Sequence, residues 1–337
     1  MTGERRSFGA AELEALAVRG LLASGTAAPA AASVAKALIK AELDGLPSHG
    51  LARMPAYCAQ VRSGKVRGDA VPTVERLGAS GARVDAADGF AYPAIDLAIA
   101  TIAEAVEASP VAAAAITNSH HFGVAGHHVE RLADHGLIGL VFGNSPAAIA
   151  PWGGKDKLFG TNPIAFGFPR DGAPSVVVDL SLSKQARGKI MLAAREGREI
   201  PDDWALDAEG RPTTDPDAAL AGSMVPMGEA KGAALVLAVE VMAAALTGAN
   251  LGFEASSFFT DQGDPPRVGQ FLLAFDPGPF SGGRFAERFE TLLGAVLGQE
   301  GTRLPGTRRL AARERAEAEG ISLTDELHAA LEELAAG

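Results

Sequence analysis

The chain has 337 residues, enough for one large α/β subunit or for two compact units. Hydrophobic residues make up 47% and charged residues 21%, a balance typical of globular proteins and not of disordered ones. The net charge of −11 argues against binding to nucleic acids or to acidic membranes. With one cysteine (Cys58), no signal peptide and no apolar run of about 20 residues, the sequence predicts a cytoplasmic protein.

The first third of the chain is expected to be mostly helical. Apolar periodicity predicts helices at 10–24 and 28–43, the second ending at Asp44-Gly45. A helix at 51–63 follows, with Pro55 in its first turn or at a kink. Residues 68–86 are predicted to be rich in strands, and 92–108 to be another helix.

An alternating pattern follows, which indicates an α/β sheet. A strand at 111–117, a helix at 124–135 and a strand at 137–142 form a strand–helix–strand unit. Further strands are expected at 164–168, 175–180 and 271–275, and helices at 284–297, 308–319 and 324–335. The helix at 230–246 carries only Lys231 and Glu240 as charges, so it is expected to be buried on most sides, against a sheet or a partner subunit. Residues 200–226 are interpreted as a long functional loop.

Several common signatures are missing from the sequence. No G-x-G-x-x-G follows a strand, and there is no phosphate-binding G-x-x-x-x-G-K-[ST] loop and no G-x-S-x-G elbow. Neither Tyr57 nor Tyr92 has a lysine four residues later, as a short-chain reductase would require. A nucleotide site, if present, must therefore be built in another way.

The segment 44–53, D-G-L-P-S-H-G-L-A-R, has the residue types of an acid–base site. Histidine titrates near neutral pH, and the arginine fork matches a carboxylate. His49 and Arg53 are four residues apart and would share a face of a helix. The alternative is structural, with Ser48 as a helix cap. Both interpretations remain open on spacing alone.

Other segments are candidates for ligand binding. The segment 118–128 holds four histidines but no Asp, Glu or Cys, and its glycines favour a ligand loop over a metal site. Gly228 to Gly232 opens the apolar helix with Lys231, which is typical of an anion site, as is 304–309 with its paired arginines. Polar residues also follow the predicted strand ending at Leu180, and Thr161 and Asn162 lie in a sharp turn that either caps itself or touches a ligand.

Together these segments resemble the malate/L-lactate dehydrogenase family of the second type, which is unrelated to the Rossmann lactate dehydrogenases. The matching segments, in order, are D-G-x-x-S-H-G-x-x-R at 44–53, N-S-H-H-F-G at 118–123, G-T-N-P at 160–163, A-R-G-K at 186–189, A-K-G at 230–232 and L-P-G-x-R-R at 304–309. The resemblance implies an α/β fold with a mixed-sheet, non-Rossmann nicotinamide-binding domain and helical N- and C-terminal elements. It also implies that residues 1–75, which carry the catalytic histidine, pack with a helical tail at 284–337, that 76–283 bind cofactor and substrate, and that the protein is a homodimer.

The resemblance also assigns roles to individual residues. His49 would be the general acid/base, with Ser48 in its hydrogen-bond relay. Arg53 and Thr161 would hold the substrate carboxylate, together with Arg187 and Gly188. The residues implied to line the cofactor are His121, Phe122, Gly123, Val124, Ala125, Asp179, Leu180, Ser181, Ala230, Lys231, Pro305, Gly306, Thr307, Arg308, Arg309 and Leu310. No metal is implied.

The implied reaction is hydride transfer between NAD(P) and C2 of a small 2-oxo or 2-hydroxy acid of the malate, lactate or sulfolactate type. The alternative is NADPH-dependent reduction of cyclic imines such as piperideine-2-carboxylate and pyrroline-2-carboxylate. The imine reductases carry an aspartate where this chain has Lys189, and a cation there favours a more anionic substrate. Arg308 and Arg309 could meet a 2′-phosphate, which favours NADP. A non-catalytic ligand-binding subunit and a metal-dependent hydrolase are the competing hypotheses from other classes.

Overall fold

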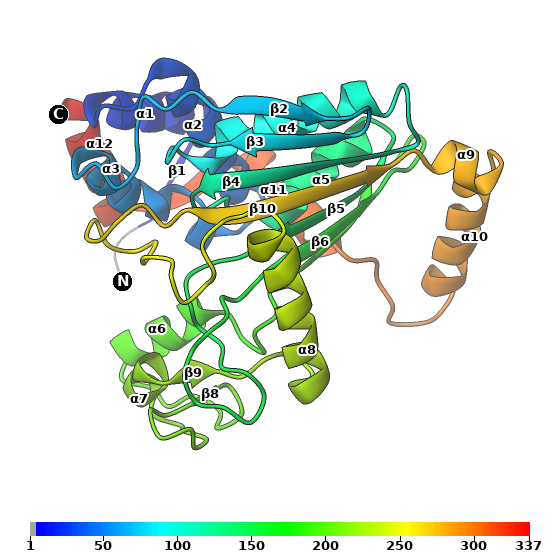
Figure 1. Cartoon of the computed structure of the whole chain (residues 1–337). Coiled ribbons are helices and arrows are strands. Elements are labelled where there is room, and N and C mark those ends of the chain that lie inside the picture. Colours follow the sequence, from blue (N-terminus) through cyan, green and yellow to red (C-terminus); the bar gives the residue numbers. More distant parts are fainter. Residues whose placement is uncertain (1–4) are drawn as a thin grey trace.

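A seven-stranded mixed sheet forms the middle of the molecule (Figure 1). The structure is a computed structural model and describes residues 5–337, so the first four residues of the predicted 1–75 segment lie outside the described residues. In order across the sheet, the strands are β2 (Thr73–Leu77), β3 (Gly81–Asp85), β4 (Val111–Ser119), β10 (Val268–Phe275), β5 (Ile138–Gly143), β6 (Ile164–Phe168) and β7 (Val176–Leu180). The strands β3 and β4 are parallel, and all other neighbours in this sheet are antiparallel. The expectation of an α/β fold with a mixed sheet is thereby confirmed.

The predicted strand–helix–strand unit is present, but its two strands are not neighbours. β4, α5 (Ala125–Asp134) and β5 follow one another in the chain, and β10 inserts between the two strands, antiparallel to both. Helices α4 (Ala91–Ala105) and α5 cover one face of the sheet with alanine, isoleucine and valine side chains. Alternate residues of β4 are buried, as expected for a strand with unlike faces. The loop between β4 and α5 therefore begins at the end of an interior strand of the sheet.

A helical group packs at one end of the sheet and combines both ends of the described chain. It contains α1 (Ala10–Ala23), α2 (Ala28–Leu43), α3 (Met54–Arg62), α11 (Thr307–Glu319) and α12 (Asp325–Ala336). The sequence did not predict β1 (Arg5–Phe8) and β11 (Ile321–Thr324), which pair antiparallel and tie the two ends together. Leu13, Leu21, Leu38 and Leu331 are among the buried side chains that these helices share. The segment that carries the predicted catalytic histidine therefore packs against the last helix of the chain.

A smaller lobe lies below the sheet in Figure 1 and has its own hydrophobic core. It contains α6 (Arg187–Arg195), β8 (Ala205–Leu206), α7 (Pro216–Ala221), β9 (Ser223–Met224), α8 (Glu229–Glu240) and the π-helical turn η3 (Val241–Ala245). The interpretation of 200–226 as a long loop is wrong, because this segment contains β8, α7 and β9. Its short elements are held by buried residues such as Ala205, Ala219 and Met224.

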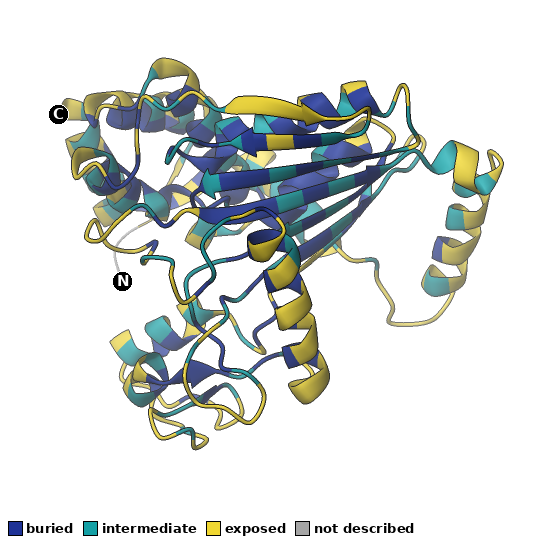
Figure 2. Ribbon diagram, viewed as in Figure 1, coloured by how far each residue is buried: buried dark blue, intermediate teal, exposed yellow. Residues whose placement is uncertain are grey.

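Two segments of the chain differ from the sequence expectation in their surroundings. Helix α8 buries Val236 and Val239 but leaves Leu237 about half exposed, so within this chain it is buried on one side only (Figure 2). Helices α9 (Pro277–Ser281) and α10 (Phe285–Leu297) project from the far end of the sheet, away from the helical group (Figure 1). Among residues 5–337, no helix is both long and apolar enough to cross a membrane.

Candidate active site

The segment around His49 is a pair of tight turns and not the helix that the spacing predicted. Two 3-10 turns, η1 (Pro47–His49) and η2 (Leu51–Arg53), flank Gly50, whose φ and ψ of −96° and −143° interrupt the helix. A Cβ atom at Gly50 would lie 2.3 Å from the carboxylate of Glu42, which accepts a hydrogen bond from the Leu51 amide at 2.7 Å. This close approach is a physical reason for glycine after the histidine. The Ser48 side chain caps no helix end, so the structural alternative for Ser48 is wrong.

The His49 ring stacks on the ring of His121, with 5.3 Å between the centroids and 9° between the planes. The Nδ1 atom of His49 is buried and has no hydrogen-bond partner among the described residues. Burial, followed by the charges of Arg53 and His127, lowers the pKa of His49 from 6.5 to about 4. The free protein therefore holds His49 neutral at physiological pH, ready to accept a proton.

A buried chain of hydroxyls fixes the second histidine. The Tyr57 hydroxyl lies 2.6 Å from His121 Nδ1 and 3.2 Å from the Tyr92 hydroxyl. Burial raises the pKa of both phenols and lowers the pKa of His121, so all three groups are neutral. The Nδ1 atom of His121 is therefore engaged with the Tyr57 hydroxyl. Sequence reasoning placed His121 only in the cofactor lining and missed its contact with His49.

Arg53 folds back over the same turn. Its Nε donates to the Ser48 carbonyl at 2.8 Å, and its guanidinium carbon lies 4.7 Å from the centre of the Phe259 ring. Its Nη1 is buried with no partner in the part of the chain that the structure describes. A buried guanidinium nitrogen needs an acceptor, and a substrate carboxylate would supply one. The Ser48 hydroxyl makes no hydrogen bond to the described residues, so its part in a relay stays a prediction.

The segments predicted to line the cofactor meet at the start of α5. The Asp179 carboxylate, at the end of β7, accepts a hydrogen bond from the Gly126 amide at 2.8 Å. A Cβ at Gly126 would lie 2.9 Å from that carboxylate, and Gly123 has a φ of +72°, which favours glycine. Gly306, at the start of α11, lies beside β7, because a Cβ there would be 3.5 Å from the Val177 carbonyl. Three segments far apart in sequence thus form one cradle around a helix N-terminus.

Leu182 connects the turn at 160–163 and the start of α8 to this cradle. The Leu182 amide donates to the Thr161 carbonyl, and the Leu182 carbonyl accepts from the Met227 amide, both at 2.8 Å. At the start of α8, Gly228 has a φ of +65°, and a Cβ at Gly232 would lie 1.4 Å from the Met227 carbonyl. Lys231 is exposed there. Tight glycine backbone, free helix amides and a lysine are suited to the phosphates of a dinucleotide, so the residues fit a nicotinamide coenzyme.

Asn162, left open as a cap or a ligand contact, has a structural role. It is fully buried, and its amide donates to the Glu240 carboxylate at 2.6 Å. Glu240 also accepts from the Gly252 amide at 2.7 Å, so this glutamate on α8 fixes the turn that carries Thr161. Arg187, Gly188 and Lys189 open α6 in the smaller lobe, and the side chains of Arg187 and Lys189 form no hydrogen bond to a described residue.

Arg309 is engaged inside the protein. Its guanidinium donates to Asp44 at 2.8 Å and to Glu130 at 2.9 Å, and Arg313 donates to the same two carboxylates. Lys40 completes the network with Glu130 at 2.7 Å. Of the paired arginines, Arg308 has no such partner among the described residues and would be the one to meet a 2′-phosphate.

Two of the other histidines of the 118–128 segment have hydrogen-bond partners. His127 Nε2 lies 2.8 Å from Asp44, and His128 Nε2 lies 2.8 Å from the Phe122 carbonyl. His120 is buried among Tyr57, Phe90 and Phe258, and neither of its ring nitrogens has a hydrogen-bond partner among the described residues. In the described part of the chain, no three histidine, cysteine or acidic side chains are grouped as a metal site requires.

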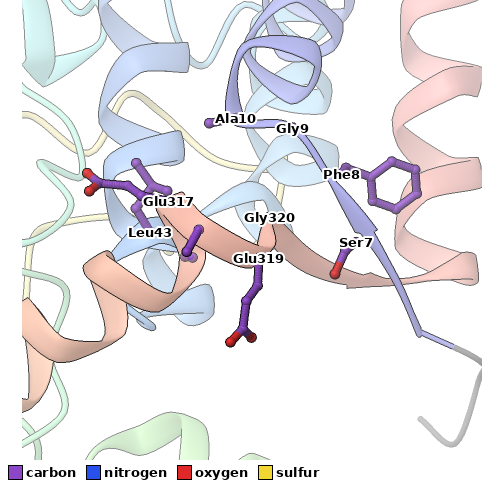
Figure 3. A pocket seen from close by; sticks show the side chains of 10 residues that line it. Ser7, Phe8, Gly9, Ala10, Leu43, Glu317, Glu319 and Gly320 are labelled. Atoms are coloured by element: carbon purple, nitrogen blue, oxygen red, sulfur yellow. The ribbon is translucent and has the colours of Figure 1, made fainter.

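A surface hollow of about 590 Å³ lies elsewhere. It is formed between β1, the end of α2 and the end of α11, and Glu317 and Glu319 stand at its rim (Figure 3). These carboxylates would repel an acidic substrate, and neither His49 nor Arg53 lines the hollow.

Comparison with known proteins agrees with this arrangement. Residues 8–332 match the family described as malate/L-lactate dehydrogenase. The chain is 56% identical to a (2R)-3-sulfolactate dehydrogenase (NADP(+)) of Chromohalobacter salexigens, over 94% of this chain and 96% of that one. It is 42% identical to a Delta(1)-pyrroline-2-carboxylate/Delta(1)-piperideine-2-carboxylate reductase of Pseudomonas syringae pv. tomato, over 92% of this chain and 91% of the relative.

A solved structure extends the likeness to three dimensions. The delta1-piperideine-2-carboxylate reductase of Pseudomonas syringae pv. tomato superposes with a TM-score of 0.92 at 40% identity, covering 98% of this chain and 99% of that one. The order of the motifs, the mixed sheet and these matches lead to one conclusion: the chain belongs to the malate/L-lactate dehydrogenase family and is an oxidoreductase of the 2-hydroxy-acid and 2-imino-acid type.

Proposed function

We propose that the protein interconverts a small, doubly charged 2-hydroxy acid and its 2-oxo acid with NADP, and that 3-sulfolactate is the substrate. The observation that carries this proposal is the pairing of His49, a neutral imidazole whose Nδ1 is buried, with Arg53, whose Nη1 has no partner among the described residues. A proton acceptor beside a free guanidinium is what the oxidation of a hydroxy acid requires. Thr161, Arg187 and Gly188 complete the proposed carboxylate site.

The residues divide the chemistry between them. A bound nicotinamide would accept or supply the hydride at C2 of the substrate. Arg53 holds the carboxylate and so fixes the position of C2, while a ring nitrogen of His49 takes the hydroxyl proton during oxidation and returns it during reduction. Return of the proton requires a charged His49, whose pKa is lowered first by burial and second by the charge of Arg53. An anionic substrate beside Arg53 would offset the second of these causes and so favour the charged form.

The positive charge at the start of α6 favours a substrate that carries a sulfonate group. Lys189 stands where the imine reductases would have an aspartate, and Arg187 and Lys189 lie within one turn of helix at its N-terminus, which itself attracts anions. The relative with 56% identity is named as a sulfolactate dehydrogenase. The second candidate, reduction of cyclic imino acids, is favoured by the 42% identical relative and by the fold shared with a piperideine-2-carboxylate reductase.

NADP is the proposed coenzyme. The relative with 56% identity is named for NADP(+), and Arg308 is free to meet a 2′-phosphate, whereas Arg309 is not. The cradle residues His121 to Ala125, Asp179 to Ser181, Ala230, Lys231 and 305–310 are the proposed binding surface. The free thiol of Cys58 fits a reducing compartment, and the proposed location is the cytoplasm.

A homodimer is part of the proposal. Leu235 and Leu237 on α8, Val241 on η3 and Leu246 just after it are exposed apolar side chains. Several such side chains on one helix of an oxidoreductase subunit are suited to contact with a second copy, since exposed apolar surface is often covered by a partner. The same helix carries Lys231 and Glu240, so the dimer would brace both the cofactor site and the Thr161 turn.

Turnover of a panel of acids tests the function. Purified protein is mixed with NADPH or NADH and with 3-sulfopyruvate, oxaloacetate, pyruvate or piperideine-2-carboxylate, and loss of the reduced nicotinamide is followed by absorbance. We expect the highest kcat/KM with 3-sulfopyruvate and NADPH. Turnover of the cyclic imine alone would select the second candidate, and no turnover with any acid would reject both.

A further inference from the structure

Lys65 is a buried cation that binds a loop. Its side chain follows α3, and its ammonium donates to the carbonyls of Ser257, Thr260 and Gln262 at 2.7, 2.9 and 2.8 Å. The residue is only 2% exposed and forms no salt bridge within the described chain. All three of its N–H groups are thus used on one short segment of backbone.

Gln60, one turn earlier on α3, holds the same segment. Its amide nitrogen donates to the carbonyls of Phe258 and Thr260 at 3.1 and 3.0 Å, and the residue is fully buried. The segment 257–262 belongs to the connection from η3 to β10, which reaches across to the helical group in Figure 1. Gln60 on α3 and Lys65 just after it therefore fix a loop that has no helix or strand of its own.

The fixed loop brings two aromatic rings to the catalytic residues. The Phe258 ring centre lies 5.2 Å from that of His120 and 5.3 Å from that of His121. The next residue, Phe259, places its ring under the Arg53 guanidinium at 4.7 Å and remains 50% exposed. One loop thus contacts both the histidine that stacks on His49 and the arginine beside it.

We propose that Phe259 is a positioning residue that holds Arg53 ready for the substrate carboxylate, and that Lys65 sets Phe259 in place. The inference rests on the proposed function, in which Arg53 anchors the carboxylate. Arg53 has one further described contact through its Nε, to the Ser48 carbonyl, and its Nη1 is left free. The Phe259 ring packs against the face of the guanidinium, and the Ser48 carbonyl accepts a hydrogen bond at its edge. Together these two contacts fix the orientation of the group.

The contact between Phe259 and Arg53 should favour binding of the carboxylate for an entropic and an electrostatic reason. A free arginine side chain must lose rotamer freedom when a ligand binds, and a residue already held in place loses less. An aromatic face attracts the guanidinium without using any of its N–H donors, so Nη1 stays available for an oxygen. Removal of the ring should therefore weaken carboxylate binding while the proton transfer at His49 continues.

Binding of oxamate, a carboxylate that resembles a 2-oxo acid but is not readily reduced, tests the inference by calorimetry in the presence of NADPH. The variants are Phe259→Leu, Phe259→Tyr as the conservative replacement, Lys65→Met, and Phe253→Leu as a control. Phe253 is 56% exposed in the same connection and is not placed at the site. We expect Phe259→Leu to raise the oxamate Kd about fivefold, the size of an exposed cation–π contact, while Phe259→Tyr and Phe253→Leu stay near wild type.

Lys65→Met should raise the oxamate Kd as Phe259→Leu does and also increase hydrogen exchange in 257–262. With an active acid, Phe259→Leu should raise KM more than it lowers kcat. An unchanged oxamate Kd in Phe259→Leu, an equal effect of Phe253→Leu, or no oxamate binding by the wild type would overturn the inference. Turnover of the acid panel by the same wild-type sample decides the proposed function separately, because oxamate binding requires no hydride transfer.

Discussion

The rings of His49 and His121 lie face to face, 5.3 Å apart, and only His121 has a hydrogen-bonded hydroxyl behind it. The Nδ1 atom of His121 is thereby engaged by Tyr57, whereas the Nδ1 atom of His49 has no partner among the described residues. An imidazole with a free nitrogen can change its protonation state without breaking a bond in the protein. This asymmetry is why we assign proton transfer to His49.

Replacement of His49 tests that assignment. His49→Ala should lower kcat for hydroxy-acid oxidation about 10²- to 10⁴-fold, the usual contribution of a general base, and leave the Kd for NADPH within twofold. The measurement is steady-state turnover alongside fluorescence titration of NADPH. His135→Ala, an exposed histidine at the end of α5, is the control and should match wild type. Full activity of His49→Ala would remove His49 from the mechanism.

The pH dependence of oxidation follows from the lowered pKa of His49. Burial and the charges of Arg53 and His127 bring this pKa to about 4, so the neutral, proton-accepting form is present above that pH. We therefore expect kcat/KM for oxidation to be flat from pH 8 down to about 5 and to fall tenfold per pH unit below about 4. A decline that begins near pH 6.5 would mean that His49 is not desolvated in the free enzyme.

The network of carboxylates and cations around Asp44 should make the free energy of unfolding depend on pH in the acid range. Burial alone would raise the pKa of Glu130, but hydrogen bonds from Arg309 and Lys40 lower it from 4.5 to about 2. A lowered carboxyl pKa gives stability that is complete above the unfolded value and is lost as pH falls from about 4.5 toward 2. We expect Glu130→Gln to cost about 1–3 kcal/mol at pH 7, measured by urea unfolding, and clearly less at pH 3. An equal cost at both pH values would contradict this.

The dimer prediction concerns the exposed apolar side chains of α8 and η3. Leu237→Lys combined with Val241→Lys should give monomers in light scattering, because two ammonium groups cannot be desolvated in an apolar interface. Leu77→Lys, which changes a similarly exposed leucine on the edge strand β2, should leave the assembly unchanged. If the double variant still assembles, the interface lies elsewhere on the protein. If the wild type is a monomer, the protein has no dimer interface.

The choice of substrate should respond to Lys189. Lys189→Asp replaces a cation with an anion at the start of α6, so we expect kcat/KM for 3-sulfopyruvate to fall at least tenfold relative to pyruvate. An increase with piperideine-2-carboxylate would agree with the aspartate expected in imine reductases. The exposed Lys36→Asp on α2 makes the same charge change away from the site and serves as the control. Equal losses on all acids would show that Lys189 acts on folding and not on specificity.

Local patterns in the sequence predicted much of this architecture. The helices at 10–24, 28–43 and 92–108 and the strands at 111–117 and 137–142 were predicted within a few residues, because each has its own apolar period. The position of β10 between β4 and β5 could not be predicted, since periodicity carries no information on which distant strands pair. The short strands β1 and β11 were missed for the same reason.

The site was predicted in part. The motifs identified His49, Arg53 and the segments of the cradle, but the turn at Gly50 depends on the carboxylate of Glu42, which no spacing rule reveals. Arg309 was expected at the coenzyme because paired arginines after a turn are typical of an anion site. Its two carboxylate partners, Asp44 and Glu130, come from helices far away in the sequence. Long-range contacts of this kind are also what hid the role of Lys65.

The late position of β10 in the chain has a consequence for biosynthesis. During translation β4 and β5 emerge more than 100 residues before the strand that joins them, so both expose unpaired backbone until residues 268–275 have been made. The sheet cannot be completed domain by domain as the chain emerges, and pairing of such distant segments is slow. Nascent chains that stall before β10 should therefore be prone to aggregate and should depend on chaperones that shield strand edges.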